Sequence, residues 1–150
     1  MIGPGICPDE VAEVAHEIGR GLAQAGFTIV TGGEGGAMEA ASRGAREVGG
    51  TVVGVLPGTD RAHANDYADI TIPTGTGHAR NLAVVASGDV VVAVGGEWGT
   101  LSEIAFAGVL GRPVVALRGW QLDHPTDLPD GVHHAETAGE AVDLAVKIVG

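Results

Sequence analysis

Short apolar runs alternate with amphipathic stretches along the whole chain, and this alternation limits the fold more than any other feature of the sequence. Four runs are rich in Val or Ile and apolar on both faces: 27–30, 52–56, 90–94 and 114–117. Strands of a parallel sheet that is covered on both sides have this pattern. Helical stretches separate them, at residues 9–25, 36–48, 77–87, 100–110 and 138–149. The sequence therefore predicts an α/β fold, a single doubly wound, Rossmann-like parallel sheet with helices on both faces.

The start of the chain departs from this alternation. Only Met1 and Ile2 precede the turn at residues 3–5, although a doubly wound fold requires a strand before its first helix. We therefore expect a truncated first strand, or a chain that starts later than its relatives do. The length, with no linker or internal repeat, predicts one domain over residues 1–150.

Two polar stretches interrupt the pattern further along the chain. Residues 57–69 form a loop before a weak strand at 70–72, and residues 120–134 form a second polar connection. The second stretch contains histidines and aspartates whose spacing fits no zinc motif. They are His124, His133, His134, Asp123, Asp127 and Asp130. A polar surface connection is the better interpretation, and no metal site is predicted.

The charge balance excludes several classes of partner. The chain has 19 acidic and 8 basic residues, for a formal net charge of −11. Nucleic acid and anionic membranes are excluded as expected partners because both require a basic surface. No apolar run approaches the ~20 residues of a membrane-spanning helix, so we expect a cytoplasmic protein. Cys7 is the only cysteine, which rules out an internal disulfide and predicts a buried or half-buried thiol.

Two glycine-rich turns, Thr31–Gly36 and Gly95–Thr100, each follow a predicted strand and precede a predicted helix. Glycine lets a ligand approach the backbone, and helix N-termini present N–H groups to phosphate. Because parallel strands end at one edge of a sheet, we expect the turns to form one phosphate or nucleotide site. Its predicted residues are Gly32, Gly33, Gly35, Gly36, Met38, Gly95, Gly96, Gly99 and Thr100. Tight turns need glycine without any ligand as well, and this alternative stays open.

Neither turn has a standard nucleotide fingerprint. A Walker loop requires Gly-Lys-Ser/Thr, and the one lysine of the chain is Lys147. The dinucleotide pattern G-x-G-x-x-G fails because, counted from Gly33, its third glycine position is Met38. A mononucleotide or a sugar phosphate therefore fits better than NAD or magnesium-bound ATP. Lys147 also lies on an amphipathic pattern typical of a surface helix, which argues against the Schiff base of a pyridoxal phosphate enzyme.

Arg80 and Glu103 are candidate ligand contacts. Arg80 stands near the start of a predicted helix, where a cation opposes the helix dipole, and this favours a position facing the site. A solvated arginine or an internal ion pair explains the position equally well. Glu103 lies one helical turn, ~5 Å, beyond the second glycine turn, about the reach from a 5′-phosphate to the anomeric carbon of its ribose. Residues 100–103 also match a capping box, and the sequence pattern does not decide between the two roles.

Several segments resemble the Lonely Guy (LOG) family of cytokinin-activating phosphoribohydrolases, historically mislabelled lysine decarboxylases. They are Gly32–Met38, Gly44-Ala45, Gly49-Gly50, Val55–Pro57, His78–Asn81, Gly88-Asp89 and Gly99–Glu103. The resemblance covers nearly the whole chain and implies a nucleotide-binding Rossmann domain. The family's catalytic arginine and glutamate carry over to Arg80 and Glu103.

Three positions depart from the LOG motifs. Gly95 replaces a proline, Glu97 stands at the second glycine of the motif, and Asn81 replaces a lysine. Glu97 thus adds a carboxylate to the phosphate turn. The pattern at residues 73–81 is closer to a shorter branch of the family that includes molybdenum-cofactor carrier proteins.

The resemblance implies two alternative functions. The first is hydrolysis of the N-glycosidic bond of a nucleoside 5′-monophosphate, which yields the free base and ribose 5-phosphate with no required cofactor. The alternative is a carrier or sensor that binds a nucleotide, a pterin phosphate or a molybdopterin-type ligand without turnover. Further ligand contacts are expected at His78, Asn81, Glu97 and Trp98.

The apolar residues of the fourth helical stretch predict that copies of the chain associate. Ala105, Phe106, Val109 and Leu110 exceed what one helix face buries, and related folds pair through helices beside the site. We therefore expect a homodimer or homotetramer. The net charge of −11 predicts that salt stabilises the fold.

Overall fold

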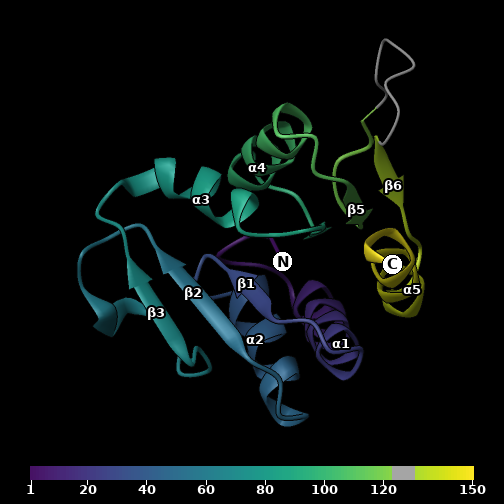
Figure 1. Cartoon of the computed structure of the whole chain (residues 1–150). Coiled ribbons are helices and arrows are strands. Elements are labelled where there is room, and N and C mark those ends of the chain that lie inside the picture. The colour runs from purple at the N-terminus through teal and green to yellow at the C-terminus, as the bar shows by residue number, and fades with distance from the viewer. Residues whose placement is uncertain (123–130) are drawn as a thin grey trace.

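A computed structural model describes residues 1–122 and 131–150 (Figure 1). The α-helices are α1 (Asp9–Gln24), α2 (Ala37–Glu47), α3 (Arg80–Ala86), α4 (Trp98–Val109) and α5 (Ala138–Val149). The strands are β1 (Ile29–Thr31), β2 (Val52–Leu56), β3 (Ile70–Pro73), β4 (Val91–Val94), β5 (Val114–Leu117) and β6 (Val132–His134). Two 3₁₀ turns, η1 (Arg61–His63) and η2 (Gly77–Ala79), precede β3 and α3. Strands and helices alternate as the hydrophobic pattern predicts.

All strand pairings between these elements are parallel, which confirms the α/β class, but the expectation of one continuous sheet is wrong. The strands form two three-stranded sheets, ordered β1-β2-β3 and β4-β5-β6. Between them Ile2 makes one isolated parallel bridge to Ala93, and its N–H donates to the Val92 carbonyl oxygen at 2.9 Å. On the other side, the Met1 amine donates to the Val30 carbonyl oxygen at 2.9 Å. One bridged residue makes too few ladder bonds to join the sheets.

The edges of β1 and β4 that face each other line a groove of about 470 Å³. The groove lies at the amino ends of these strands, because its lining includes residues 27–30 and 90–92. It is therefore at the opposite end of the strands from the two glycine turns.

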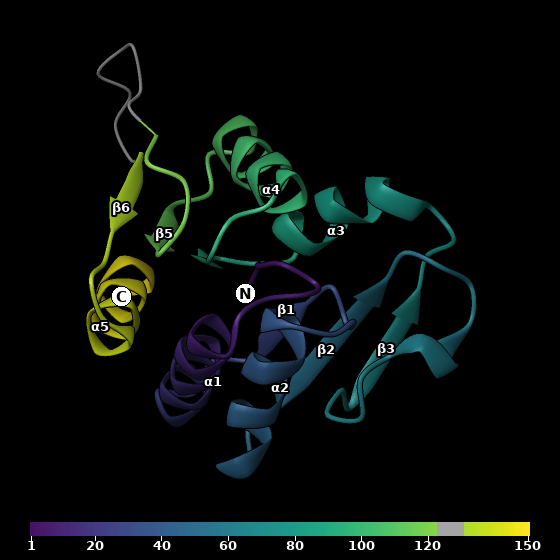
Figure 2. The same ribbon diagram turned by 180° about the vertical axis from the view of Figure 1, so that it is seen from behind.

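Helices cover both faces of the strands. Figures 1 and 2 show α3 and α4 on one side and α1, α2 and α5 on the other. Alternate residues of β4 pack on opposite faces of the strand. Val92 and Val94 pack in the core under α1, α2 and α5. Val91 and Ala93 pack in the core under α3 and α4. This alternation explains why β4 is apolar throughout.

Residues 132–134, assigned from the sequence to a polar connection, form β6, and this assignment was wrong. β6 pairs with β5 at the edge of its sheet, and its residues are half-buried or exposed. An edge strand with one open side does not require the apolar run that identifies buried strands. His133 and His134 lie on it, whereas His124 and the aspartates at 123, 127 and 130 lie outside the described residues.

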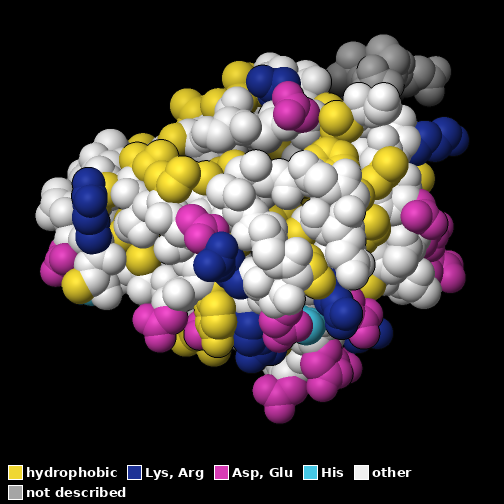
Figure 3. Space-filling model, turned by 60° about the horizontal axis from the view of Figure 1, so that its bottom comes forward, with side chains coloured by type: hydrophobic (Ala, Val, Ile, Leu, Met, Phe, Trp, Pro, Cys, Tyr) yellow, Lys and Arg dark blue, Asp and Glu magenta, His cyan; other side chains and the backbone are white. Residues whose placement is uncertain are grey.

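Surface charge, metal-ligand clusters and helix hydrophobicity bear on the classes of partner considered from the sequence. On the face shown in Figure 3, basic side chains lie among acidic ones. Within residues 1–122 and 131–150, no group of three or more His, Cys, Asp or Glu residues is placed to hold a metal ion. No described helix is both long and apolar enough to cross a membrane. Cys7 is half-buried, as expected.

Candidate functional site

The first glycine turn, residues 32–36, is tightly packed where it leads from β1 into α2. Gly36 has φ +60°, and a Cβ at this position would collide with the Pro4 carbonyl oxygen. That oxygen accepts a hydrogen bond from the Ala37 N–H at 3.0 Å. No side chain caps α2, but the Pro4 carbonyl oxygen occupies the Ala37 N–H, so an anion would bind to the N–H groups that follow Ala37 in the first turn. A helix start of this kind suits an anion.

The second glycine turn lies beside the first. Gly95 follows β4 with φ +68°, and a Cβ there would lie 3.3 Å from Cδ of Pro4. Both turns therefore pack against the same proline. α4 begins at Trp98 with Glu97 as its N-cap residue, and no side chain caps it. The two uncapped helix starts thus meet at one edge of the strands, as the glycine patterns predict.

The capping-box interpretation of residues 100–103 is wrong. Because α4 begins two residues before Thr100, that threonine lies inside the first helical turn and cannot be the N-cap. The Thr100 hydroxyl is buried and has no hydrogen-bond partner among the described residues. Glu103 therefore does not cap the N-terminus of α4, and its side chain is buried.

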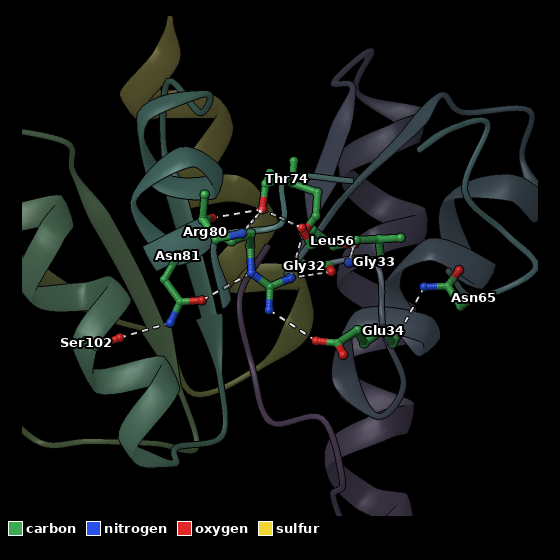
Figure 4. Close-up of polar contacts among 12 residues, drawn as sticks. Gly32, Gly33, Glu34, Leu56, Asn65, Thr74, Arg80, Asn81 and Ser102 are labelled. Carbon is green, nitrogen blue, oxygen red and sulfur yellow. Dashed lines mark hydrogen bonds and ion pairs between the residues drawn. The ribbon is translucent and has the colours of Figure 1, made fainter. Parts of the chain in front are cut away.

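Arg80 is the buried centre of the site (Figure 4). Its Nη1 donates to the carbonyl oxygens of Gly32 and, at 2.6 Å, Val55. Its Nη2 contacts Glu34 Oε2 at 3.1 Å, and its Nε donates to Asn81 Oδ1 at 3.3 Å. Four of the five guanidinium N–H groups are thus used within the protein. The internal ion pair left open by the sequence is present, and it holds the first turn.

A chain of hydrogen bonds runs from Arg80 to the second turn. Asn81 accepts from Arg80 and donates to the Ser102 hydroxyl at 3.0 Å (Figure 4). That hydroxyl donates to the Gly99 carbonyl oxygen at 2.7 Å. The first turn is also held by Asn65, whose side chain donates to the Glu34 carbonyl oxygen at 2.9 Å. Asn81 therefore links the two turns rather than standing open to a ligand.

Glu103 lies on α4 behind the second turn, and its side chain is 8% exposed. Burial raises its pKa to about 7, although the positive charges of the Met1 amine and of Arg80 act in the opposite direction. A carboxyl group with this pKa holds a proton in a substantial fraction of molecules near neutral pH. Such a group can donate or accept a proton there.

The remaining predicted residues differ in their surroundings. Met38 packs against the first turn: a Cβ on Gly32 would lie 2.6 Å from its Sδ. His78 is exposed on η2. Glu97 and Trp98 are exposed at the start of α4 and line an open hollow there. The predicted residues thus divide into a buried set around Arg80 and an exposed set at the second turn.

Several residues of the site are not predicted from the sequence. Glu34, Asn65 and Ser102 hold the turns, and Trp120 borders the hollow beside Trp98. Nothing in the local pattern singles out Asn65 or Trp120, because their partners lie far away along the chain. The sequence pattern singles out Ser102 only as a member of the supposed capping box.

The chain matches the SLOG cluster4 family over residues 1–144. It is similar to the molybdenum cofactor binding protein of Rippkaea orientalis, with a TM-score of 0.87 and 33% identity over 99% of this chain and 94% of that one. It is also similar to the molybdenum cofactor carrier protein of Chlamydomonas reinhardtii, with a TM-score of 0.86 and 36% identity over 99% and 96% of the two chains.

A curated enzyme is a more partial match. The cytokinin riboside 5′-monophosphate phosphoribohydrolase of Mycobacterium tuberculosis is 33% identical over 74% of this chain. The chain spans 64% of the length of that enzyme. The similarity to the cofactor-binding proteins therefore extends over more of both partners.

Proposed function

The chain belongs to the SLOG cluster4 family, and from this membership and the geometry of the two turns we propose that it is a carrier or sensor for a phosphorylated small molecule. The ligand is a molybdenum-cofactor-type pterin phosphate or a nucleotide, held without turnover. The resemblance to LOG proteins is thereby confirmed at the level of the family. The proposal takes up the second of the two functions that the resemblance implies.

The observation that carries the proposal is the occupation of Arg80. In a hydrolase the arginine contacts the substrate or the departing base through free N–H groups, and the contacts described leave Arg80 only one of its five. Here the guanidinium bonds to two backbone carbonyl groups, Glu34 and Asn81. These contacts fit an arginine that shapes the binding surface.

The residues present suit a phosphate group. The starts of α2 and α4 lie together and receive no side-chain caps. Their dipoles, and the N–H groups other than that of Ala37, which the Pro4 carbonyl oxygen occupies, suit the oxygens of one phosphate. By contrast, Thr137 caps α5 by accepting from the Glu140 N–H at 3.2 Å, and α5 lies away from the turns. When bound, a molybdenum cofactor would supply a metal bound to a pterin. This chain would contribute the seat for the phosphate.

Ligand binding and turnover can be measured on the same protein. Isothermal titration with GMP, with neopterin phosphate and with ribose 5-phosphate should show binding, while the release of free base from a panel of nucleoside monophosphates should stay at the uncatalysed rate. Multiple-turnover base release would overturn the carrier proposal. The absence of binding for every phosphorylated probe would also overturn it.

The second candidate function is phosphoribohydrolase activity, and Glu103 favours it. Its pKa of about 7 is what a general acid or base needs near neutral pH. If base release occurs, Glu103→Gln should lower its rate by about 10²–10³. Near-normal turnover in this variant would remove Glu103 from the chemistry. Exposed Glu13, on α1, gives the matched Glu→Gln control.

We also propose that two copies pair through α3 and α4. Val109 at the end of α4 is 82% exposed, Leu110 follows it and is also exposed, and Leu82 on the neighbouring α3 is exposed as well. Large apolar side chains gathered on one face favour association. Sedimentation velocity should show a dimer, and Val109→Glu should shift it to monomer. A monomer at both low and high salt would contradict this pairing.

A further inference from the structure

Two tryptophans meet at the second glycine turn. Trp98 and Trp120 have ring centroids 5.4 Å apart with planes inclined by 45°. Trp98 is 78% exposed at the start of α4. The chain has two Trp, one Tyr and two Phe, and both of its tryptophans lie at this turn. Exposure of so large an apolar ring costs solvation free energy, which a ligand that covers the ring recovers.

The backbone of the turn is shaped around this pair. A Cβ on Gly96 would lie 2.8 Å from Cδ1 of Trp120, so glycine makes room for the indole. The indole Nε1–H donates to the Glu97 carbonyl oxygen at 3.3 Å, which ties Trp120 to the turn. Both rings border an open hollow together with Gly96, Glu97 and Gly99. Trp120 is thus held in place, and Trp98 presents its ring beside a helix start suited to phosphate.

We propose that Trp98, supported by Trp120, is a stacking surface for the flat heteroaromatic ring of the bound ligand. This inference rests on the proposed function, because the phosphate of the same ligand would occupy the two helix starts. Aromatic side chains stack on any flat ring, and each such contact is worth about 1–3 kcal/mol. The arrangement gives one ligand two contacts, an anionic end on the turns and a ring on the indole.

The carboxylate of Glu97 restricts which heteroaromatic ring the site favours in its ligand. A carboxylate beside a phosphate seat repels the ligand unless it faces N–H donors. Glu97 is exposed, borders the hollow and makes no side-chain capping bond to α4. A fused ring with a 2-amino-4-oxo edge, the chemistry that guanine and pterin share, presents adjacent N–H groups that one carboxylate accepts. An adenine ring lacks this edge.

The test separates the ring from the phosphate. Isothermal titration with GMP, neopterin phosphate and ribose 5-phosphate is carried out on the wild type, Trp98→Ala and Trp98→Phe. We expect Trp98→Ala to weaken binding of both ring ligands by about 5- to 150-fold and to leave ribose 5-phosphate unchanged. Trp98→Phe should keep most of the affinity because phenylalanine also stacks. Val149→Ala, an exposed apolar truncation on α5, is the control.

The outcomes divide between the two proposals. If the wild type binds no phosphorylated probe, the proposed function fails, and the stacking surface fails with it. If ring ligands bind equally to the wild type and to Trp98→Ala, only the stacking surface is overturned. This conclusion also holds when sedimentation shows that Trp98→Ala has lost a dimer contact. The relative affinity for GMP and for neopterin phosphate identifies which ring is preferred.

Glu97→Gln tests the choice of ring independently. The wild type should prefer GMP to AMP, and the variant should lose most of that preference while still binding ribose 5-phosphate. An unchanged ratio of GMP to AMP affinities in Glu97→Gln would overturn the role of the carboxylate.

Discussion

The two glycine turns have similar sequences and opposite surroundings. The first is held from several sides, by the buried Arg80, by Asn65 and by Pro4. The second turn is linked to this framework through Ser102, but its outer side is open and carries the exposed Trp98. The difference shows how one site can combine a rigid seat with an accessible surface. We infer that the first turn provides geometry and the second provides contacts that distinguish ligands.

The largest expected effect comes from removing Arg80, the clamp that holds the first turn. Arg80→Met should lower the free energy of unfolding by about 3–5 kcal/mol, because it leaves the buried carbonyl groups of Gly32 and Val55 without donors. Urea denaturation measures this change. Arg118→Met is the control, since Arg118 makes an exposed ion pair with Glu10 at 3.8 Å and should change stability by at most about 1 kcal/mol. A loss below 1 kcal/mol in Arg80→Met would show that the first turn does not depend on the clamp.

The next effect concerns Glu103, which lies on the helix of the open turn but is buried near the clamp. Its pKa rises on folding from 4.5 to about 7, so the folded state binds the proton more tightly than the unfolded state. The contribution of Glu103 to stability should therefore fall as pH rises from 4.5 to about 7, by up to about 3 kcal/mol. The buried Met1 amine, whose pKa is lowered from 8.0 to about 6, contributes a rise in stability between about pH 6 and pH 8, in the wild type and in Glu103→Gln alike. In Glu103→Gln this fall should be absent.

Chemical denaturation of both proteins at pH 4.5 and pH 8 measures the difference. Glu13→Gln is again the control, because Glu13 is exposed on α1 and this substitution should not change the pH dependence. Parallel pH profiles for the wild type and Glu103→Gln would contradict the raised pKa.

A smaller effect compares the turns directly through one added methyl group. Gly36→Ala should destabilise the protein by about 1–3 kcal/mol, because φ is +60° there and the methyl group would strike the Pro4 carbonyl oxygen. Gly99→Ala should be neutral or stabilising by up to about 1 kcal/mol, because Gly99 lies inside α4 and a Cβ there meets nothing within 4 Å. Thermal unfolding compares the two variants. Equal losses would mean that both turns are closed.

The smallest expected effect is that of salt. With a formal net charge of −11, the folded chain repels itself, and salt at 0.1 M screens these charges over a Debye length of about 10 Å. The melting temperature should rise on adding salt. A lower melting temperature in salt would mean that attractive pairs such as Arg46–Asp69, at 2.6 Å, outweigh the repulsion.

The sequence by itself determined the elements that local pattern controls. The strand at 52–56 and the helix at 138–149 are found with the predicted bounds, because buried strands and amphipathic helices have distinct periods over a few residues. The positions of the two glycine turns followed in the same way, since each lies between a strand and a helix.

Tertiary structure decided what those elements contact. Arg80 was singled out by its unfavourable place at a helix start, but its carbonyl partners lie 48 and 25 residues away. The separation into two sheets depends on whether one residue, Ile2, can join two strand edges, and Trp98 meets Trp120 only because α4 and the segment after β5 lie together. Contacts of this kind arise from packing between distant segments, and no periodicity within a short window records them.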